Sequence, residues 1–229
     1  MNKIFQTALF AAAIATGASA AAQAVAPAKA AKPAAASQPA RAPFLIKGFR
    51  SARFGTDETT VRAAIARDFK PADGAVTVFD NPVEKTHVVA VHLESLAPAP
   101  GAVNITYIFG TTTQKLIHVN VVWSTGPTPT EEERNQMASG GVELSAYFQA
   151  QAWRPGATGA GAAKDASYFI FFQGADPKGA AVDLRGAGIS IVLKKGEPAS
   201  KPAGPATLRL AYYATSGASD TAEVTPGSF

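Results

Sequence analysis

Cysteine is absent from the 229 residues of this chain. Its absence excludes disulfides, thiolate metal ligands and cysteine nucleophiles. It also removes the residue that carries the lipid of an exported lipoprotein, so we expect no lipid anchor. Histidine is scarce, with three residues, which leaves few side chains for a metal site or for proton transfer near neutral pH. We therefore expect no metal ion and no cofactor.

Charged residues make up only 17% of the chain, and their distribution is uneven. No acidic residue precedes Asp57, whereas seven of the 21 basic residues do. The rest of the chain holds 14 basic and 17 acidic residues, a net charge of −3, so the overall charge of +4 comes from the N-terminal segment. A nucleic-acid-binding domain would cluster basic residues on a folded face together with stacking aromatic rings. The sequence shows no such cluster, and we expect no nucleic-acid partner.

The first 24 residues have the composition of a secretory signal. Lys3 precedes the apolar run 4–17, and small-residue cleavage patterns end at Ala20 and Ala24. The apolar run is too short to span a membrane, and no later segment approaches the ~20 apolar residues of a transmembrane helix. We therefore predict a signal peptide over 1–24, cleaved near Ala20 or Ala24, a periplasmic or secreted protein, and no transmembrane span.

Residues 25–43 are rich in Ala, Pro and Lys and contain little that a core would bury. The four prolines in this segment interrupt any continuous helix and favour extended conformations. We predict a semi-rigid linker between the signal and the folded part of the chain.

The first helix is predicted to begin at Thr56 or Asp57, either of which can serve as the N-cap. Apolar residues follow at i, i+3, i+4 and i+8, which is the period of one helix face. These are Val61, Ala64, Ile65 and Phe69. A second helix follows residues 126–129, capped by Thr128 with Glu131 or by Thr130 with Glu133. Gly140 and Gly141 predict a kink in it, or two shorter helices.

Alternating apolar residues predict strands both between the two helices and after the second one. The predicted strands are 76–79, 86–96, 103–109, 117–123, 167–173, 181–185, 189–194 and 207–214. The glycine-rich segment 156–161 is predicted to be a flexible loop.

This order predicts an α+β fold with two helix-plus-antiparallel-sheet units in tandem, which share or abut one core. We expect two main helices and seven or eight strands. The first unit would span 44–125 and the second 126–215, followed by a polar tail over 216–229. The sequence leaves the oligomeric state open.

The segment 55–61, with the sequence GTDETTV, resembles the helix-opening motif of the SmpA/OmlA (BamE-type) outer-membrane assembly lipoproteins. In that motif Gly-Met-Thr is followed by three variable positions, a Val and a Leu-rich turn. The matching positions are Gly55, Val61 and, in place of the capping Thr, Asp57; Thr56 replaces the Met, and Ala64 with Ile65 replaces the Leu pair. The resemblance implies the helix-plus-sheet unit that secreted β-lactamase inhibitor proteins contain twice. The chain departs from the family because it has neither a lipidated Cys nor a second Gly-Met-Thr.

Strand alternation places several polar side chains on the outer face of the first predicted sheet. These candidate binding residues are His92, Asn104, Thr106, His118 and Asn120. A solvated sheet face with no ligand explains the same pattern. His87 and His92 are five residues apart on one strand and therefore lie on opposite faces, so they do not form a metal-binding pair.

No catalytic motif occurs in the sequence. A Gly-x-Ser-x-Gly elbow is missing, and the segment 156–161 lacks the Lys of a phosphate-binding loop. We therefore favour a non-catalytic module that presents a sheet face or loops to an envelope protein. The alternatives are an envelope hydrolase that uses carboxylates or His118, and a purely structural periplasmic protein. The sequence assigns no role to four arginines near the first helix, Arg50, Arg53, Arg62 and Arg67.

Overall fold

The computed structural model describes residues 42–162, 168–189, 202, 204–215 and 220–221. Contacts divide the chain into residues 1–40 and 41–229, and all described residues belong to the second unit. The predicted signal peptide, most of the linker, most of the polar tail and nearly all of the predicted strand 189–194 lie outside the described residues. Of the helices in the described part, none combines the length and apolarity that crossing a membrane requires.

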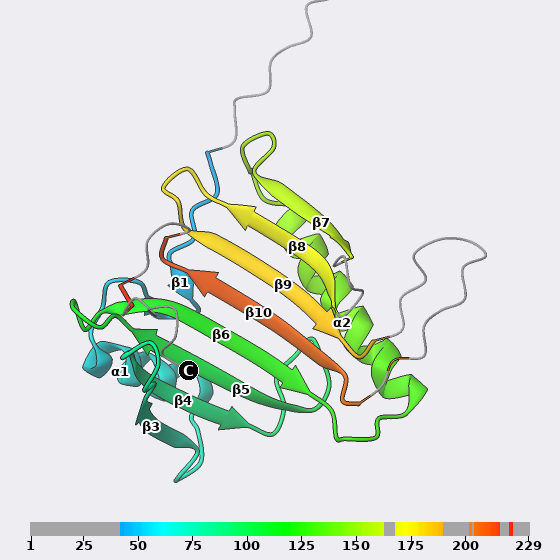
Figure 1. The fold of residues 1–229 in the computed structure, drawn as a ribbon, viewed down its shortest axis with the longest axis horizontal. Helices are drawn as coiled ribbons and strands as arrows, with labels where there is room; N and C mark the ends of the chain where they lie inside the picture. Colours follow the sequence, from blue (N-terminus) through cyan, green and yellow to red (C-terminus); the bar gives the residue numbers. More distant parts are fainter. Residues whose placement is uncertain (1–41, 163–167, 190–201, 203, 216–219, 222–229) are drawn as a thin grey trace, which may run out of the picture. The chain divides into compact units, whose positions relative to one another are not determined.

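The described residues form an α+β fold, with two helices, an eight-stranded antiparallel sheet and a two-stranded sheet (Figure 1). The elements are β1 (Gly48–Phe49), β2 (Ala52–Arg53), α1 (Glu58–Phe69), β3 (Val76–Asp80), β4 (His87–Leu93), β5 (Ala102–Phe109), β6 (Leu116–Ser124), α2 (Glu131–Gln149), β7 (Thr158–Ala162), β8 (Phe169–Ala175), β9 (Ala181–Ala187) and β10 (Thr207–Tyr213). The predicted fold class, with two helices and antiparallel strands, is confirmed. The predicted domain boundaries stay predictions.

The strand order in the large sheet is β3-β4-β5-β6-β10-β9-β8-β7. The four strands after α1 therefore form one half and the four strands after α2 form the other. The two halves meet where β6 and β10 pair, with Val121 opposite Leu210 and Trp123 opposite Leu208. Because these four side chains are 2% exposed or less, the apolar core continues across the junction.

Both helices lie on the same face of the large sheet (Figure 1). On α1 this face buries Val61, Ala64 and Ile65, and on α2 it buries Met137 and Phe148. These side chains belong to one core cluster that includes alternate residues of β4, β5, β6, β9 and β10. The residues between them in each strand point to the opposite face, which carries the site described below.

Asp57 is the N-cap of α1, as one of the two predictions for this helix has it. Its Oδ1 accepts a hydrogen bond of 3.0 Å from the Thr60 N–H. Thr56 instead donates its hydroxyl to the Arg53 carbonyl at 2.7 Å. Capping by an ionised side chain at the positive end of the helix dipole lowers the pKa of Asp57 through the hydrogen bonds from Thr60.

The N-cap of the second helix is Thr130, which forms a reciprocal capping box with Glu133, as one of the two predictions has it; the other predicted cap, Thr128, is wrong. The helix differs from its prediction in one respect. The two central glycines do not break it, since α2 is continuous. A Cβ on Gly140 would lie 2.9 Å from the Ala99 Cβ, and one on Gly141 would lie 2.6 Å from the Phe171 ring. These glycines therefore allow the helix to approach the sheet closely.

A second difference concerns the segment 156–161, for which the sequence predicts a loop. Residues from Thr158 onward form β7, an edge strand paired with β8. The register shifts between Gly159 and Gly161, where the strand is irregular. A glycine-rich strand has no side-chain alternation to reveal it, because its pairing depends on backbone hydrogen bonds alone.

A buried carboxylate fixes the segment before β1 to the turn between β8 and β9. Asp176 is 2% exposed, and its Oδ2 accepts a hydrogen bond of 2.9 Å from the Ile46 N–H. Its Oδ1 accepts from the N–H groups of Lys178 at 2.7 Å and Ala180 at 3.1 Å. One side chain thus joins two parts of the chain that are 130 residues apart.

Three of the four unassigned arginines make local contacts around α1. The contacts are Arg50 over the Phe69 ring at 4.8 Å, Arg62 Nε to Glu58 Oε1 at 2.6 Å, and Arg67 Nε to Ser51 Oγ at 3.2 Å. The contacts of Arg50 and Arg67 join the β1–β2 hairpin to α1, and the Arg62–Glu58 pair lies within α1. All three arginines thus have a structural explanation. Arg53 is exposed, and nothing in the structure explains its charge.

Candidate functional site

The face of the large sheet opposite the helices is free of any helix in the described part of the chain (Figure 1). We call it the open face. Polar side chains reach it from β4, β5, β6, β10, β9 and β8 because alternate residues of each strand point the same way. They are His92, Asn104, Thr106, His118, Asn120, Arg209, Tyr213, Asp183, Arg185 and Gln173.

The five predicted binding residues all lie on this face, but they do not form one site. His92 pairs with Asn104 across strands, and its Nδ1 lies 3.0 Å from the Asn104 Oδ1. His118 lies on β6, with its Nε2 3.1 Å from the Asn120 Oδ1. The registers separate the two histidines by two strands and four residues along the strand, or roughly 16 Å. They cannot act on one small ligand together, and their role in binding stays a prediction.

Thr106 lies opposite Asn120 in the pairing of β5 with β6. It is half-buried between the two histidine pairs. Among the described residues, no group of three or more His, Asp or Glu side chains is placed to hold a metal ion.

His118 and Asn120 belong to a network that continues onto β10. Arg209 Nε donates to the Asn120 Oδ1 at 3.0 Å, and Arg209 Nη2 donates to the Tyr213 hydroxyl at 2.9 Å. The Tyr213 ring stacks on the imidazole of His118, with 4.2 Å between ring centroids. The network closes on itself, so each of the four side chains is held by two others.

The next strand adds an ion pair, Asp183 with Arg185. Arg185 Nη2 donates to the Asp183 Oδ2 at 2.9 Å, and its Nε lies 2.6 Å from Oδ1, although that N–H is not aligned for a hydrogen bond. Asp183 is 8% exposed, so the pair is shielded from solvent on the carboxylate side. The hydrogen bond with Asp183 raises the pKa of Arg185. The Tyr168 ring lies 4.8 Å from the guanidinium carbon of Arg185.

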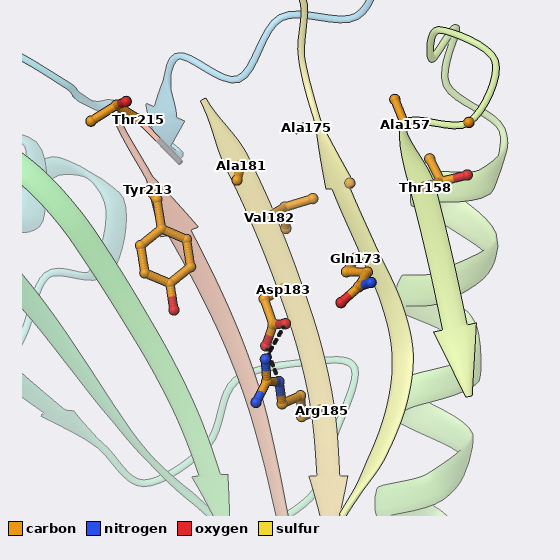
Figure 2. A pocket seen from close by; sticks show the side chains of 12 residues that line it. Ala157, Thr158, Gln173, Ala175, Ala181, Val182, Asp183, Arg185, Tyr213 and Thr215 are labelled. Carbon is orange, nitrogen blue, oxygen red and sulfur yellow. Dashed lines mark hydrogen bonds and ion pairs between the residues drawn. The ribbon is translucent and has the colours of Figure 1, made fainter. Parts of the chain in front are cut away.

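An open groove of about 700 Å³ runs beside these groups on the open face. Figure 2 shows its side chains in order across four strands, from Tyr213 on β10 through the Asp183–Arg185 pair on β9 to Gln173 on β8 and Thr158 on β7. This volume lies within the 300–1,000 Å³ that is usual for small-ligand sites. Arg209 does not line the groove itself, but it contacts Tyr213 and lies 3.8 Å from the Asp183 Oδ1.

His118 is uncharged at neutral pH. Burial and, to a smaller extent, the positive charge of Arg209 lower the pKa of its imidazole to about 4, against the opposing effect of the hydrogen bond with Asn120. The charged side chains described above are therefore two guanidinium groups and one carboxylate, which together carry one excess positive charge.

The sequence predictions include His118 and Asn120 but miss Arg209, Tyr213, Asp183 and Arg185. Alternation in 181–187 and 207–213 indicates that these four side chains point away from the core. What the sequence does not reveal is that β10 lies between β6 and β9, which brings these side chains together with His118.

Comparison of the chain with protein-family models, with curated proteins and with solved structures finds no match in any of the three. The resemblance of segment 55–61 to the SmpA/OmlA lipoproteins therefore stays a prediction.

Proposed function

We propose that this protein is a non-catalytic binding module of the bacterial envelope, and that the open face of its sheet carries the binding site. One observation supports this most directly. A groove of about 700 Å³ lies on the open face and is lined by charged and polar side chains that are already held by one another. Binding to groups that are fixed in advance costs less conformational entropy than binding to mobile ones.

The arrangement of the helices agrees with this proposal. Both cover the same face of the sheet, and the core cluster to which they contribute lies on that side. The open face contributes polar side chains from six strands without a described helix over it. Sites built on strands hold their side chains more precisely than sites on loops.

The hydrolase alternative receives less support. His92 and His118 lie roughly 16 Å apart by strand register, so they cannot converge on one acidic side chain. The carboxylate near His92 is that of the exposed Glu94, 3.7 Å away, and neither residue lines the groove. The imidazole of His118 bonds to Asn120 and stacks on Tyr213. The structural alternative differs from the proposal only in having no ligand or partner.

A photo-crosslinking amino acid at position 173 tests the proposal in intact cells. Gln173 is exposed and lines the groove, so we expect adducts with an envelope partner from this position. Gln136 is a matched control, because it is exposed on α2, which packs on the other face of the sheet. Adducts from neither position, or equally from both, would contradict the assignment of binding to the open face.

A further inference from the structure

The charged groups at the groove are out of balance. Arg185 and Arg209 both approach one carboxylate, that of Asp183. The remaining groove side chains named above, Gln173 and Thr158, are neutral, and His118 is uncharged near pH 7. One guanidinium charge therefore has no counterpart among these side chains.

The geometry around Tyr213 adds a directed donor. Its oxygen accepts a hydrogen bond from Arg209 Nη2, which leaves the hydroxyl hydrogen to donate in another direction. Tyr213 lines the groove together with Arg185, whose guanidinium is held between Asp183 and the Tyr168 ring. The groove thus has a neutral O–H donor and a fixed guanidinium at neighbouring strands.

A carboxylate matches both features. It has the charge that the cluster lacks, and its two oxygens accept from a planar guanidinium and from a hydroxyl in one plane. Arg loses little side-chain freedom on binding when other contacts already fix its orientation. A neutral ligand would use the hydrogen bonds but leave the excess charge uncompensated.

We propose that the groove on β7–β10 binds its ligand through a carboxylate group, which is recognised by Arg185 and the Tyr213 hydroxyl and attracted by the charge of Arg209. This inference rests on the proposed function of the open face as a binding surface. It specifies the chemistry that this face recognises.

Matched probes test the role of the carboxylate directly. We suggest titrating the full chain with the dipeptide N-acetyl-Ala-Ala, with the C-terminal amide of the same dipeptide and with inorganic phosphate, while backbone amide signals are followed by NMR. The dipeptide acid is expected to cause saturable chemical-shift changes of the backbone amides of β8, β9 and β10. The dipeptide amide is expected to cause none. Phosphate shows whether the site accepts oxyanions in general, and binding of phosphate alone would contradict the proposal.

Two variants separate recognition from folding. Tyr213→Phe removes the hydroxyl donor and is expected to weaken binding of the acid about tenfold, the usual effect of losing a hydrogen bond to a charged group. Asp183→Asn removes the competing carboxylate and is expected to tighten binding of the acid. A residue with a merely structural role would not improve binding when it is replaced.

The control variant is Arg62→Gln, which removes a positive charge on α1, far from the groove. It is expected to leave binding of the acid unchanged. If Asp183→Asn does not fold, the dependence of acid binding on salt concentration serves as the test in its place. Binding of the acid by the unaltered chain should weaken as salt rises, because ions screen the attraction to the two guanidinium groups.

Equal binding of acid and amide, or weaker binding after Asp183→Asn in a folded protein, would overturn the inference. The proposed function would survive either result if position 173 still forms adducts with a partner. Loss of those adducts together with the absence of any probe binding would reject both.

Discussion

Asp176 is the residue at which a single substitution should reveal most about how the segment before β1 is held to the turn between β8 and β9. Its carboxylate accepts hydrogen bonds from three backbone N–H groups, those of Ile46, Lys178 and Ala180. Asp176→Ala removes all three and leaves donors in a region where Asp176 itself is 2% exposed. Each bond to a charged acceptor contributes about 1.5–3 kcal/mol, but water can replace the partner at the half-buried Lys178 amide. We therefore expect a loss of about 3–4 kcal/mol in the free energy of unfolding.

Asp176→Asn separates the hydrogen bond to Ile46 from the two hydrogen bonds within the turn. An asparagine can keep its Oδ1 toward the two amides of the turn, Lys178 and Ala180. Its NH₂ group then faces the Ile46 N–H, where two donors meet and no hydrogen bond forms. We expect about half the loss of the alanine variant, roughly 2 kcal/mol. For a chain of this size each kcal/mol lowers Tm by about 2–4 °C.

Urea unfolding followed by circular dichroism measures both losses, and amide hydrogen exchange locates them. Exchange at Ile46 should increase in both variants, and exchange at Lys178 and Ala180 only in Asp176→Ala. A loss below about 1 kcal/mol for Asp176→Ala would refute the reasoning, because it would mean that water satisfies the freed amides. Equal losses in the two variants would show that the bond to Ile46 carries all of the effect.

Three further predictions concern titration and packing. His118 has a pKa of about 4 in the folded protein against 6.5 in the unfolded chain, so the unfolded state binds more protons between these pH values. The free energy of unfolding should therefore fall by about 3 kcal/mol as the pH drops from 6.5 to 4. Urea unfolding at several pH values measures this fall, which should be smaller in His118→Asn. The Thr113 hydroxyl and the amides of Thr112 and Thr113 donate hydrogen bonds to Asp220 and lower its pKa to about 2. Protection of the two amides should be complete above pH 4 and lost as the pH falls through about 2, and an unchanged exchange rate in Asp220→Asn would contradict this. Gly141→Ala should destabilise the protein by about 1–3 kcal/mol in thermal unfolding, because the added Cβ would lie 2.6 Å from the Phe171 ring. This loss is expected despite the better helix propensity of alanine. As a control, Ser139→Ala at an exposed position of the same helix should change stability by less than about 0.5 kcal/mol.

The elements that the sequence predicts well are those with a local signal. Asp57 caps α1 because its side chain reaches an amide three residues on, and such a contact can be inferred from spacing alone. The strands β5 and β6 alternate cleanly, because one of their faces packs on the core and the other does not.

The features that sequence reasoning missed depend on contacts between distant residues. Gly140 and Gly141 look like a helix break until Ala99 and Phe171 are known to lie against them. The groove depends on the position of β10, because only this strand brings Arg209 and Tyr213 beside His118. No periodicity within β10 indicates which strands it pairs with.

The central position of the last described strand also has a consequence for how the chain folds. Arg209 and Asn120, which β10 and β6 bring together, are 89 residues apart in the sequence. Until residues 207–213 are available, β6 and β9 both have unpaired edges, and the core on either side remains incomplete. Folds dominated by such long-range pairings fold slowly, and unpaired edges are where partly folded chains associate. Completion of the sheet is thus tied to its final strand, and any factor that delays this strand prolongs the period in which the protein is prone to aggregate.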